Sequence, residues 1–289
     1  MIFARRNNYW RTLLVLGRAS NIPTVWSNCL AGWILGGGEN HLKLVGLCLG
    51  ASFLYLGGMF LNDAFDAGFD RQYRRQRPIP SGAISAREVW FFGFALLGTG
   101  GVVLFSMGKV TALLTVFLVV SILIYDAVHK MISVSPLVMA ACRFLLYLAA
   151  ASTARHGVSG LTVWSAVALA AYIVGLSFLA RKESVRGPLQ YWPCLFLGVP
   201  LALALLVNDS SRQVLVSTIW FLLAAWILWA LRQTFWSPQR NVGITVSFLL
   251  AGIPLVDWLA VGGKDFTTSA LFLIFFLSSL LFQRFIPAT

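Results

Sequence analysis

Long apolar segments, separated by short polar connections, recur along almost the whole chain. A helix needs about 20 apolar residues to cross a hydrocarbon core of roughly 30 Å. The pattern predicts spans at 14–36, 43–65, 88–107, 110–126, 135–153, 161–179, 190–207, 213–232, 242–261 and 267–285. The segment at 190–207 is short and contains Pro193 and Pro200, so both nine and ten helices are compatible with the pattern. The sequence thus predicts an all-α, polytopic membrane bundle of nine or ten transmembrane helices.

The composition agrees with a membrane protein. Of the 289 residues, 58% are hydrophobic and only 11% are charged, and the mean hydropathy is +0.80, far from the average of soluble globular proteins. No linker or shift in composition divides the chain, so residues 1–289 are expected to form a single domain. The first apolar segment follows several arginines and is long enough to span, so we expect it to stay attached rather than to be cleaved as a signal peptide.

The cysteines and histidines do not have the spacing of a metal centre. The four cysteines lie within or beside apolar segments and show no CxxC pattern, so we expect small core residues rather than a zinc site or disulfides. The histidines His41, His129 and His156 fall in three different connections, with no carboxylate at ligand spacing. They are expected to be solvated or interfacial.

Lysine and arginine fall unevenly on the two sides of the predicted spans. With the N-terminus inside, the ten-span pattern places sixteen of them in inner connections and five in outer ones. Cytoplasmic connections accumulate positive charge. We therefore expect a multi-pass protein of the bacterial inner (cell) membrane, with the N-terminus and the charged loops after the second and fourth spans cytoplasmic. The same bias explains the pI of about 10.2 without nucleic acid as a partner.

One stretch, NDAFDAGFD at 62–70, holds three of the ten acidic residues. Asn62, Asp66 and Asp70 are spaced by four, so on an α-helix each step turns by only about 40° and the three share one face. Like charges at this spacing repel, and Mg²⁺ would relieve the repulsion, since it binds through one or two carboxylates together with phosphate oxygens. Asp63 points away and is the weaker ligand. In the alternative, these acids pair with the arginines that follow.

A basic turn comes directly after the acidic stretch. Planar guanidinium groups match phosphate oxygens in bidentate fashion, and four arginines stand here: Arg71, Arg74, Arg75 and Arg77. Ser85 and Glu88 then form an S-x-x-E pattern, which predicts a capping box at the start of the next helix. Carboxylates and arginines this close together indicate a metal ion bound beside a polyanion, and the apolar surroundings indicate that the anion carries a hydrophobic tail.

The pattern NxxxDxxxD followed by RPIPSG resembles the first signature of the UbiA superfamily of intramembrane prenyltransferases. The resemblance extends over essentially the whole chain, because LGRASNIPTVWSNCLAG, YDAVHK and SPLVMAACRFLLYLAA lie where that superfamily has related segments. The segments LGRASNIPTVWSN and SFLARKES are most similar to the EboC-like subgroup.

The resemblance implies a helical bundle around a cavity that opens sideways to lipid. In it, Asn62, Asp66 and Asp70 hold Mg²⁺ and an isoprenyl diphosphate is bound beside them. Diphosphate-binding residues of the superfamily correspond to Arg77, Tyr125 and Lys130. Considered without the resemblance, Tyr125 and Lys130 would be an ordinary interfacial tyrosine and a snorkelling lysine.

The superfamily's second aspartate motif, DxxxD, is incomplete in this chain. Counting back from the glycine that follows the motif places its two acids at Leu179 and Glu183. One carboxylate is kept as Glu183, a further metal ligand, and one is lost. Arg181 and Lys182 lie beside it, so their charges could bind diphosphate in place of a second metal ion. The alternative is that the segment is merely a charged helix end.

Arg143 lies inside a predicted span, where an arginine is costly and marks a functional position by default. Two roles are open for it: diphosphate binding in the cavity, or a structural partnership within the bundle. Asp209, Asp257 and Asp265 lie near the opposite membrane side in this topology. They are assigned no catalytic role.

The resemblance implies a Mg²⁺-dependent intramembrane prenyltransferase. It would move an isoprenyl group from a prenyl diphosphate to a hydrophobic, typically aromatic acceptor, with Asp66, Asp70 and Lys130 catalytic and membrane lipid around it. The incomplete second motif leaves an alternative: a catalytically degenerate relative that binds or transports a lipid-like or aromatic metabolite. An ordinary transporter fits less well, because its acids should lie near the bilayer midplane rather than at helix ends.

Overall fold

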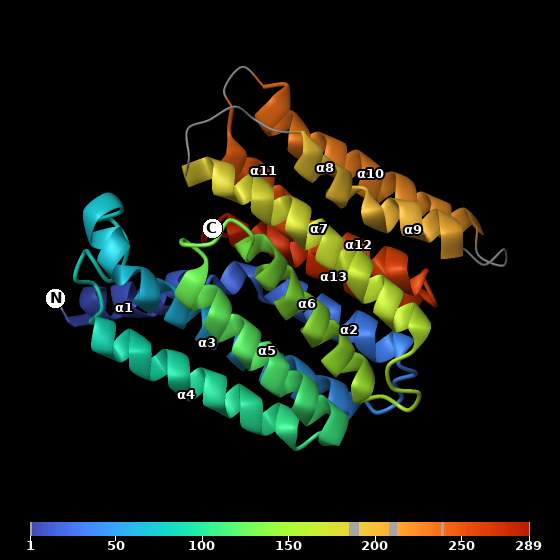
Figure 1. Ribbon diagram of the computed structural model, residues 1–289, viewed down its shortest axis with the longest axis horizontal. Helices are drawn as coiled ribbons and strands as arrows, with labels where there is room; N and C mark the ends of the chain where they lie inside the picture. Colours follow the sequence, from blue (N-terminus) through green and yellow to red (C-terminus); the bar gives the residue numbers. More distant parts are fainter. Residues whose placement is uncertain (1, 185–190, 208–212, 238–239, 289) are drawn as a thin grey trace.

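The structure is a computed structural model that describes residues 2–184, 191–207, 213–237 and 240–288, and this part of the chain contains helices and no strand. The helices are α1 (Ile2–Leu16), the 3₁₀ turn η1 (Ala19–Asn21), α2 (Ile22–Leu35), α3 (His41–Tyr73), α4 (Ala86–Phe105), α5 (Lys109–Val128), α6 (Ser135–Ser152), α7 (Gly160–Ser184), α8 (Trp192–Leu197), α9 (Val199–Val207), α10 (Gln213–Phe235), α11 (Val242–Ala251), α12 (Ile253–Val261) and α13 (Phe266–Gln283). Figure 1 shows α3, α4 and α5 side by side at one side of the bundle and α8, α9 and α10 at the other, with α6, α7, α12 and α13 between them.

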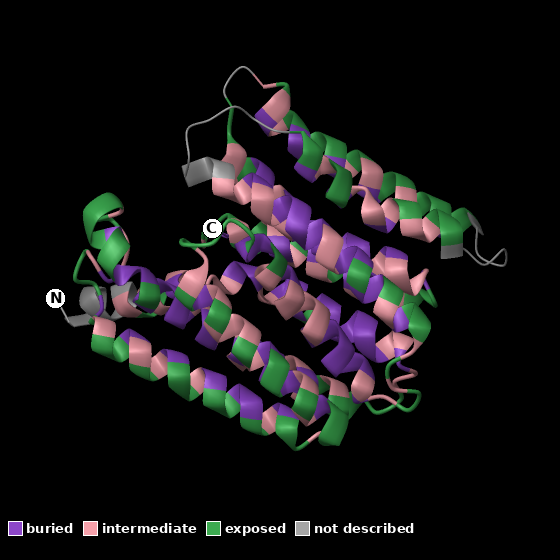
Figure 2. Ribbon diagram, in the orientation of Figure 1, coloured by how far each residue is buried: buried purple, intermediate pink, exposed green. Residues whose placement is uncertain are grey.

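The described helices confirm the prediction of an all-α membrane bundle. Eight spans are long and apolar enough to cross a membrane, α11 and α12 together counting as one of them. The segment at 190–207 is divided into α8 and α9, and Pro200 opens the second of them because proline cannot continue the ladder of the first. Buried residues gather along the middle of the bundle and exposed ones along its outer helices (Figure 2). Many of the exposed side chains are large and apolar, as lipid contact requires.

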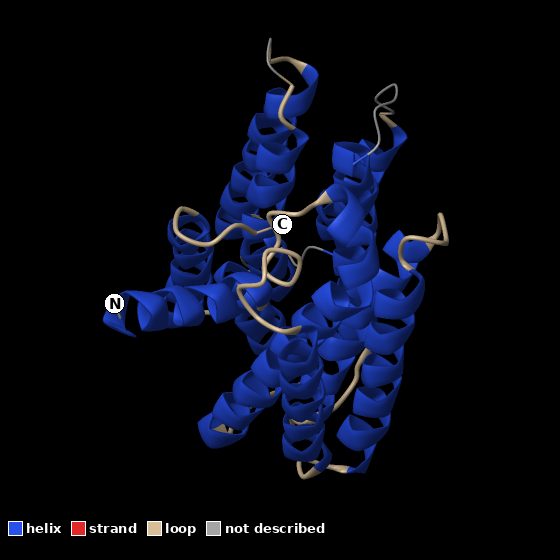
Figure 3. Cartoon of the chain, turned by 90° about the vertical axis from the view of Figure 1, so that its left-hand side faces the viewer, coloured by secondary structure: helices blue, strands red, loops and turns tan. Residues whose placement is uncertain are grey.

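The predicted span at 14–36 is wrong as a single helix. The chain breaks after α1, where Arg18 adopts the left-handed conformation with φ 42°, and Pro23 stands in the first turn of α2. Figure 3 shows α1 lying across the direction of the long helices. The break brings Arg18 to the wall of the cavity described below.

Helix α3 runs for 33 residues and carries the whole acidic stretch on one continuous helix. It packs tightly on α4, because a Cβ atom added at Gly57 would lie 2.8 Å from the backbone nitrogen of Leu97. The predicted capping box at the start of α4 is confirmed: the Glu88 backbone N–H donates to Ser85 Oγ at 3.2 Å, and the Ser85 N–H donates to Glu88 Oε2 at 3.0 Å. The close contact of α3 with α4 thus fixes the helix that positions the acids.

Candidate active site

A cavity of about 460 Å³ lies between α3, α5, α6 and α7. Aliphatic and aromatic side chains make up much of its wall, and charged side chains gather at one part of it. Seven of the predicted site residues line this cavity: Asn62, Asp66, Arg77, Tyr125, Lys130, Arg143 and Arg181. The structure therefore brings together residues from 62 to 181 in the sequence, as a single site requires.

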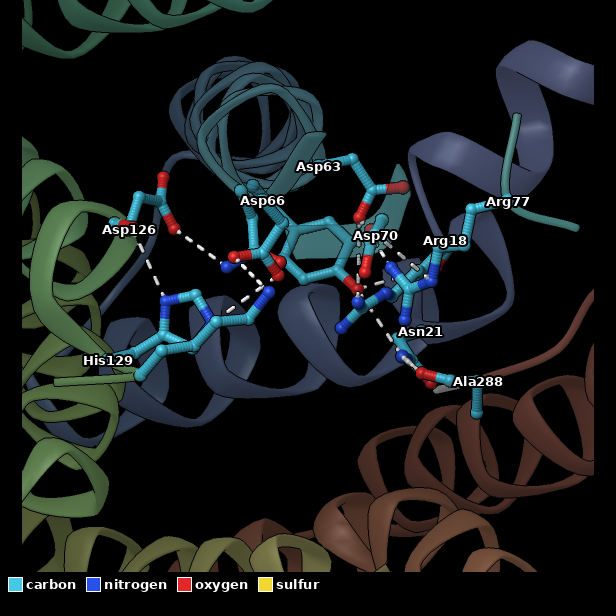
Figure 4. A network of polar contacts seen from close by, with 12 residues as sticks. Arg18, Asn21, Asp63, Asp66, Asp70, Arg77, Asp126, His129 and Ala288 are labelled. Atoms are coloured by element: carbon cyan, nitrogen blue, oxygen red, sulfur yellow. Dashed lines mark hydrogen bonds and ion pairs between the residues drawn. The ribbon is translucent and has the colours of Figure 1, made fainter. Parts of the chain in front are cut away.

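Asp66 is the centre of the charged part of the cavity (Figure 4). Its Oδ1 lies 2.7 Å from Lys130 Nζ, and its Oδ2 lies 3.5 Å from His129 Nε2. One helical turn earlier, the Asn62 side-chain amide donates to Oδ1 of Asp126 at 3.2 Å. Helix periodicity explains the grouping, since residues four apart on α3 face the same neighbour, α5.

Asp63 and Asp70 point toward arginines instead. Arg77 Nη1 lies 2.8 Å from Asp63 Oδ1, and its Nε lies 3.9 Å from Asp70 Oδ2. Arg18 Nη2 lies 3.8 Å from the same Asp63 oxygen. The alternative in which the acids pair with arginines therefore holds for Asp63. Asp70 is only 1% exposed and is absent from the cavity wall, so it lies behind the site rather than in it.

The end of α5 and the residues directly after it contribute aromatic and basic side chains to the cavity. Tyr125 stacks on His129 with ring centroids 5.1 Å apart, and Lys130 Nζ lies 3.9 Å from the centre of the Phe69 ring. The expectation that His129 is simply solvated or interfacial is wrong. Its Nε2 faces Asp66, because the one-turn step from Tyr125 carries the ring onto the cavity side of α5.

The register predicted for the second motif is wrong at Leu179. This side chain is 2% exposed and belongs to the apolar core, whereas Ser177 and Arg181 line the cavity. Residues two apart on a helix lie about 200° apart, so a cavity face through 177 and 181 excludes 179. The side chains of Lys182 and Glu183 lie outside the part of the chain whose side chains the structure describes.

Arg143 is tied to α2 while it lines the cavity. Its Nη1 donates to Asn28 Oδ1 at 2.7 Å and to the Thr24 carbonyl at 3.3 Å, and its Nη2 donates to Thr24 Oγ1 at 3.0 Å. The Asn28 amide donates in turn to Asp257 Oδ2 at 2.7 Å. Asn28 therefore links a cation of α6 to a carboxylate of α12, which gives Arg143 the structural partnership that was one of its two predicted roles.

Three site residues received no functional role in the sequence analysis: Arg18, Asp126 and His129. A sequence pattern could have pointed to the last two, since YDAVHK places an acid, a histidine and a lysine at the end of an apolar span. Arg18 had no such pattern, because its position depends on the left-handed turn between α1 and η1.

The donor set fits Mg²⁺ only when phosphate supplies further ligands. Among the described residues, no three His, Cys, Asp or Glu side chains are placed to hold a metal ion. At or directly behind this site, two buried carboxylate oxygens, Oδ1 of Asp70 and Oδ2 of Asp126, accept no hydrogen bond from the described residues. Mg²⁺ commonly takes one or two carboxylates and completes its shell with water and phosphate. Asn62, Asp66 and Asp126 meet that requirement.

Comparison with known proteins places this geometry in context. The UbiA prenyltransferase family matches residues 20–187. A digeranylgeranylglyceryl phosphate synthase of Methanosarcina mazei is 33% identical over 86 residues, 29% of this chain and 30% of that protein. A 4-hydroxybenzoate octaprenyltransferase of Edwardsiella ictaluri is 36% identical over 96 residues, 32% of each chain. The matched segments thus span about a third of these relatives.

Solved structures share the fold over a greater length. One from a study of digeranylgeranylglyceryl phosphate synthase in membranes has a TM-score of 0.62 at 17% identity, covering 88% of this chain and 97% of that one. A UbiA homologue from Archaeoglobus fulgidus bound to GPP and Mg²⁺ has a TM-score of 0.54 at 15% identity, covering 95% and 97%. At these identities the likeness shows a common fold, that of an integral, multi-pass membrane protein.

Proposed function

Because this chain belongs to the UbiA prenyltransferase family, we propose that it is an intramembrane prenyltransferase. In this proposal it moves an isoprenyl group from a prenyl diphosphate to a hydrophobic, typically aromatic acceptor, in a Mg²⁺-dependent reaction and within a single domain. The observation that carries the proposal is the pairing of Asp66 with Lys130 and His129 in the charged part of a cavity whose remaining wall is largely apolar. That combination suits a substrate with a charged head and a hydrophobic tail.

Positive side chains of the cavity would bind the diphosphate. Arg18, Arg77 and Lys130 line its wall, and guanidinium and ammonium groups stabilise phosphate oxygens best where negative charge develops. Departure of the diphosphate leaves an allylic cation at C1 of the prenyl chain. The apolar wall would keep water from that cation until the acceptor attacks. Tyr125 and the partly buried Arg143 stay proposed diphosphate contacts on the same wall.

Asn62, Asp66 and Asp126 would hold Mg²⁺, which when bound supplies further neutralisation of the leaving diphosphate. Asp70 would orient Arg77 through their ion-pair contact, from behind the cavity wall. Roles for Lys182 and Glu183 stay predictions. So do the bacterial inner membrane, the cytoplasmic N-terminus and loops, and the EboC-like subgroup.

A second function has one observation in its favour. The cavity face of α7 carries Ser177 and Arg181, and neither is a hard-metal ligand of the carboxylate type. A site with fewer carboxylates can still bind a prenyl diphosphate through its arginines while releasing diphosphate slowly. The protein would then be a catalytically degenerate relative that binds or transports a lipid-like or aromatic metabolite.

One assay separates the two functions. The purified protein is given prenyl diphosphates from geranyl to longer chains, with and without Mg²⁺ and with a panel of aromatic acceptors, and both binding and diphosphate release are measured. The proposal expects release that depends on Mg²⁺ and on an acceptor, and that is lost in Asp66→Asn but kept in the surface variant Arg155→Ala. Binding without release supports the degenerate relative. Absence of binding to every prenyl diphosphate would overturn both.

A further inference from the structure

The connection between α5 and α6 carries Lys130, and an arginine from α7 holds it. Arg181 Nη1 lies 2.8 Å from the Ile132 carbonyl oxygen and 2.9 Å from that of Ser133. The same atom lies 2.9 Å from Ser135 Oγ. Ser135 Oγ donates to the His129 carbonyl at 3.1 Å. Hydrogen bonds thus lead from α7 to the residue directly before Lys130.

This connection has little packing of its own to fix it. Met131 is 83% exposed, and Ile132 and Val134 are also exposed, so apolar burial contributes little to its position. A segment with few buried contacts opens at low free-energy cost. Its carbonyl oxygens need donors from elsewhere, and a guanidinium group carries five N–H donors in a rigid plane.

We propose that Arg181 is a positioning residue, which fixes the 129–135 connection so that Lys130 meets Asp66. The proposal rests on the proposed function and adds a role for the cavity face of α7. Arg181 lies on the cavity face of α7, which Leu179 does not reach. It holds the connection that carries Lys130 in place through hydrogen bonds rather than through a metal ion.

The first test measures the connection itself, without substrate. Hydrogen–deuterium exchange of the amides in 131–135 is compared in the wild type, Arg181→Ala and Arg155→Ala, all as full chains in the same detergent. Arg155 is a matched control, since its pair with Glu39 is exposed on both sides. We expect faster exchange in these amides for Arg181→Ala alone. Unchanged exchange in Arg181→Ala would overturn the proposal, whatever the substrate is.

The second test asks whether Arg181 acts through Lys130. Diphosphate release from geranyl diphosphate is measured for Arg181→Ala, Lys130→Ala and the double variant. Loss of positioning should slow release about 10- to 100-fold in the wild-type background. In the Lys130→Ala background the same change should cost less than about twofold, since the two residues act as one unit. Equal losses in both backgrounds would mean direct substrate contact and would overturn the positioning role.

If neither the wild type nor any variant releases diphosphate, the proposed function fails. The exchange measurement alone then decides the role of Arg181.

Discussion

Lys130 Nζ lies 2.7 Å from Asp66 Oδ1, within the range of a charge-assisted hydrogen bond. The two residues come from different elements, α3 and the connection after α5, so the pair depends on how these elements are packed. It also means that the negative charge of Asp66 is already balanced by the protein. A divalent ion bound at Asp66 must share that carboxylate with Lys130 or turn the lysine toward the phosphate.

Lys130→Met tests this competition. Without the ammonium group, Asp66 keeps an unbalanced charge, so we expect tighter binding of Mg²⁺ alone. Binding of geranyl diphosphate should weaken about 10- to 100-fold, as the loss of a charge-assisted hydrogen bond implies. Calorimetry with each ligand separately measures both effects. Lys109→Met, at the other end of α5, is the control and should change neither; weaker binding of both ligands to Lys130→Met would contradict the competition.

Asp66 and Asp70 should differ in effect, although both belong to the same predicted motif. Asp66→Asn removes a carboxylate of the cavity wall, and we expect it to abolish the part of geranyl diphosphate binding that Mg²⁺ enhances. Asp70→Asn changes a buried residue whose described ion-pair contact is Arg77, so Mg²⁺ enhancement should survive in weakened form. Titrations of geranyl diphosphate with and without Mg²⁺ measure the difference. A complete loss in Asp70→Asn with normal Mg²⁺ dependence in Asp66→Asn would show that the roles are reversed.

We expect the Asn28 side chain to contribute more to the free energy of unfolding than its size indicates. Replacing it with alanine removes the hydrogen bonds that join Arg143 to Asp257, although Arg143 keeps Thr24 and Asp257 keeps Ser27 as partners. Removing one partner of a buried hydrogen bond costs about 1–3 kcal/mol in the free energy of unfolding. Thermal unfolding in detergent should show a lower midpoint for Asn28→Ala. Arg155→Ala should leave the midpoint nearly unchanged, because exposed ion pairs contribute little; similar midpoints for the two variants would argue against the network.

Two glycines make a matched pair for the contact of α3 with α4. A Cβ atom at Gly57 would lie 2.8 Å from Leu97 N and 2.9 Å from the Gly93 carbonyl oxygen, and these backbone atoms have little room to move. We expect Gly57→Ala to destabilise the protein by about 1–3 kcal/mol through overpacking. Gly98→Ala meets no atom within 4 Å and should be neutral or slightly stabilising, since alanine favours a helix. Urea or thermal unfolding of both variants checks this, and equal destabilisation would refute the packing argument.

Local patterns were enough to predict most of the helices and much of the site. Apolar segment length predicted the spans, and four-residue spacing placed Asn62 and Asp66 on one face, because both features follow from the geometry of a single helix. The capping box of Ser85 and Glu88 was predictable for the same reason. None of these predictions required knowledge of which helices are neighbours.

The errors arose where tertiary packing decides. Asp70 continues the four-residue spacing, yet Arg77 folds back on it and it lies behind the cavity. Motif spacing pointed to Leu179, but the orientation of α7 in the bundle turns Ser177 and Arg181 inward instead. The sequence gives no local sign of that rotation. His129 was assigned to solvent because its partner, Asp66, is 63 positions earlier in the chain.

The wall of the cavity also includes Ala288, whose carbonyl accepts a hydrogen bond from the Asn21 side-chain amide at 3.0 Å (Figure 4). These residues lie 267 positions apart, so this part of the wall joins the beginning of the chain to a segment that the ribosome makes much later. The residues after α13 must therefore fold back against η1 before this part of the wall can form.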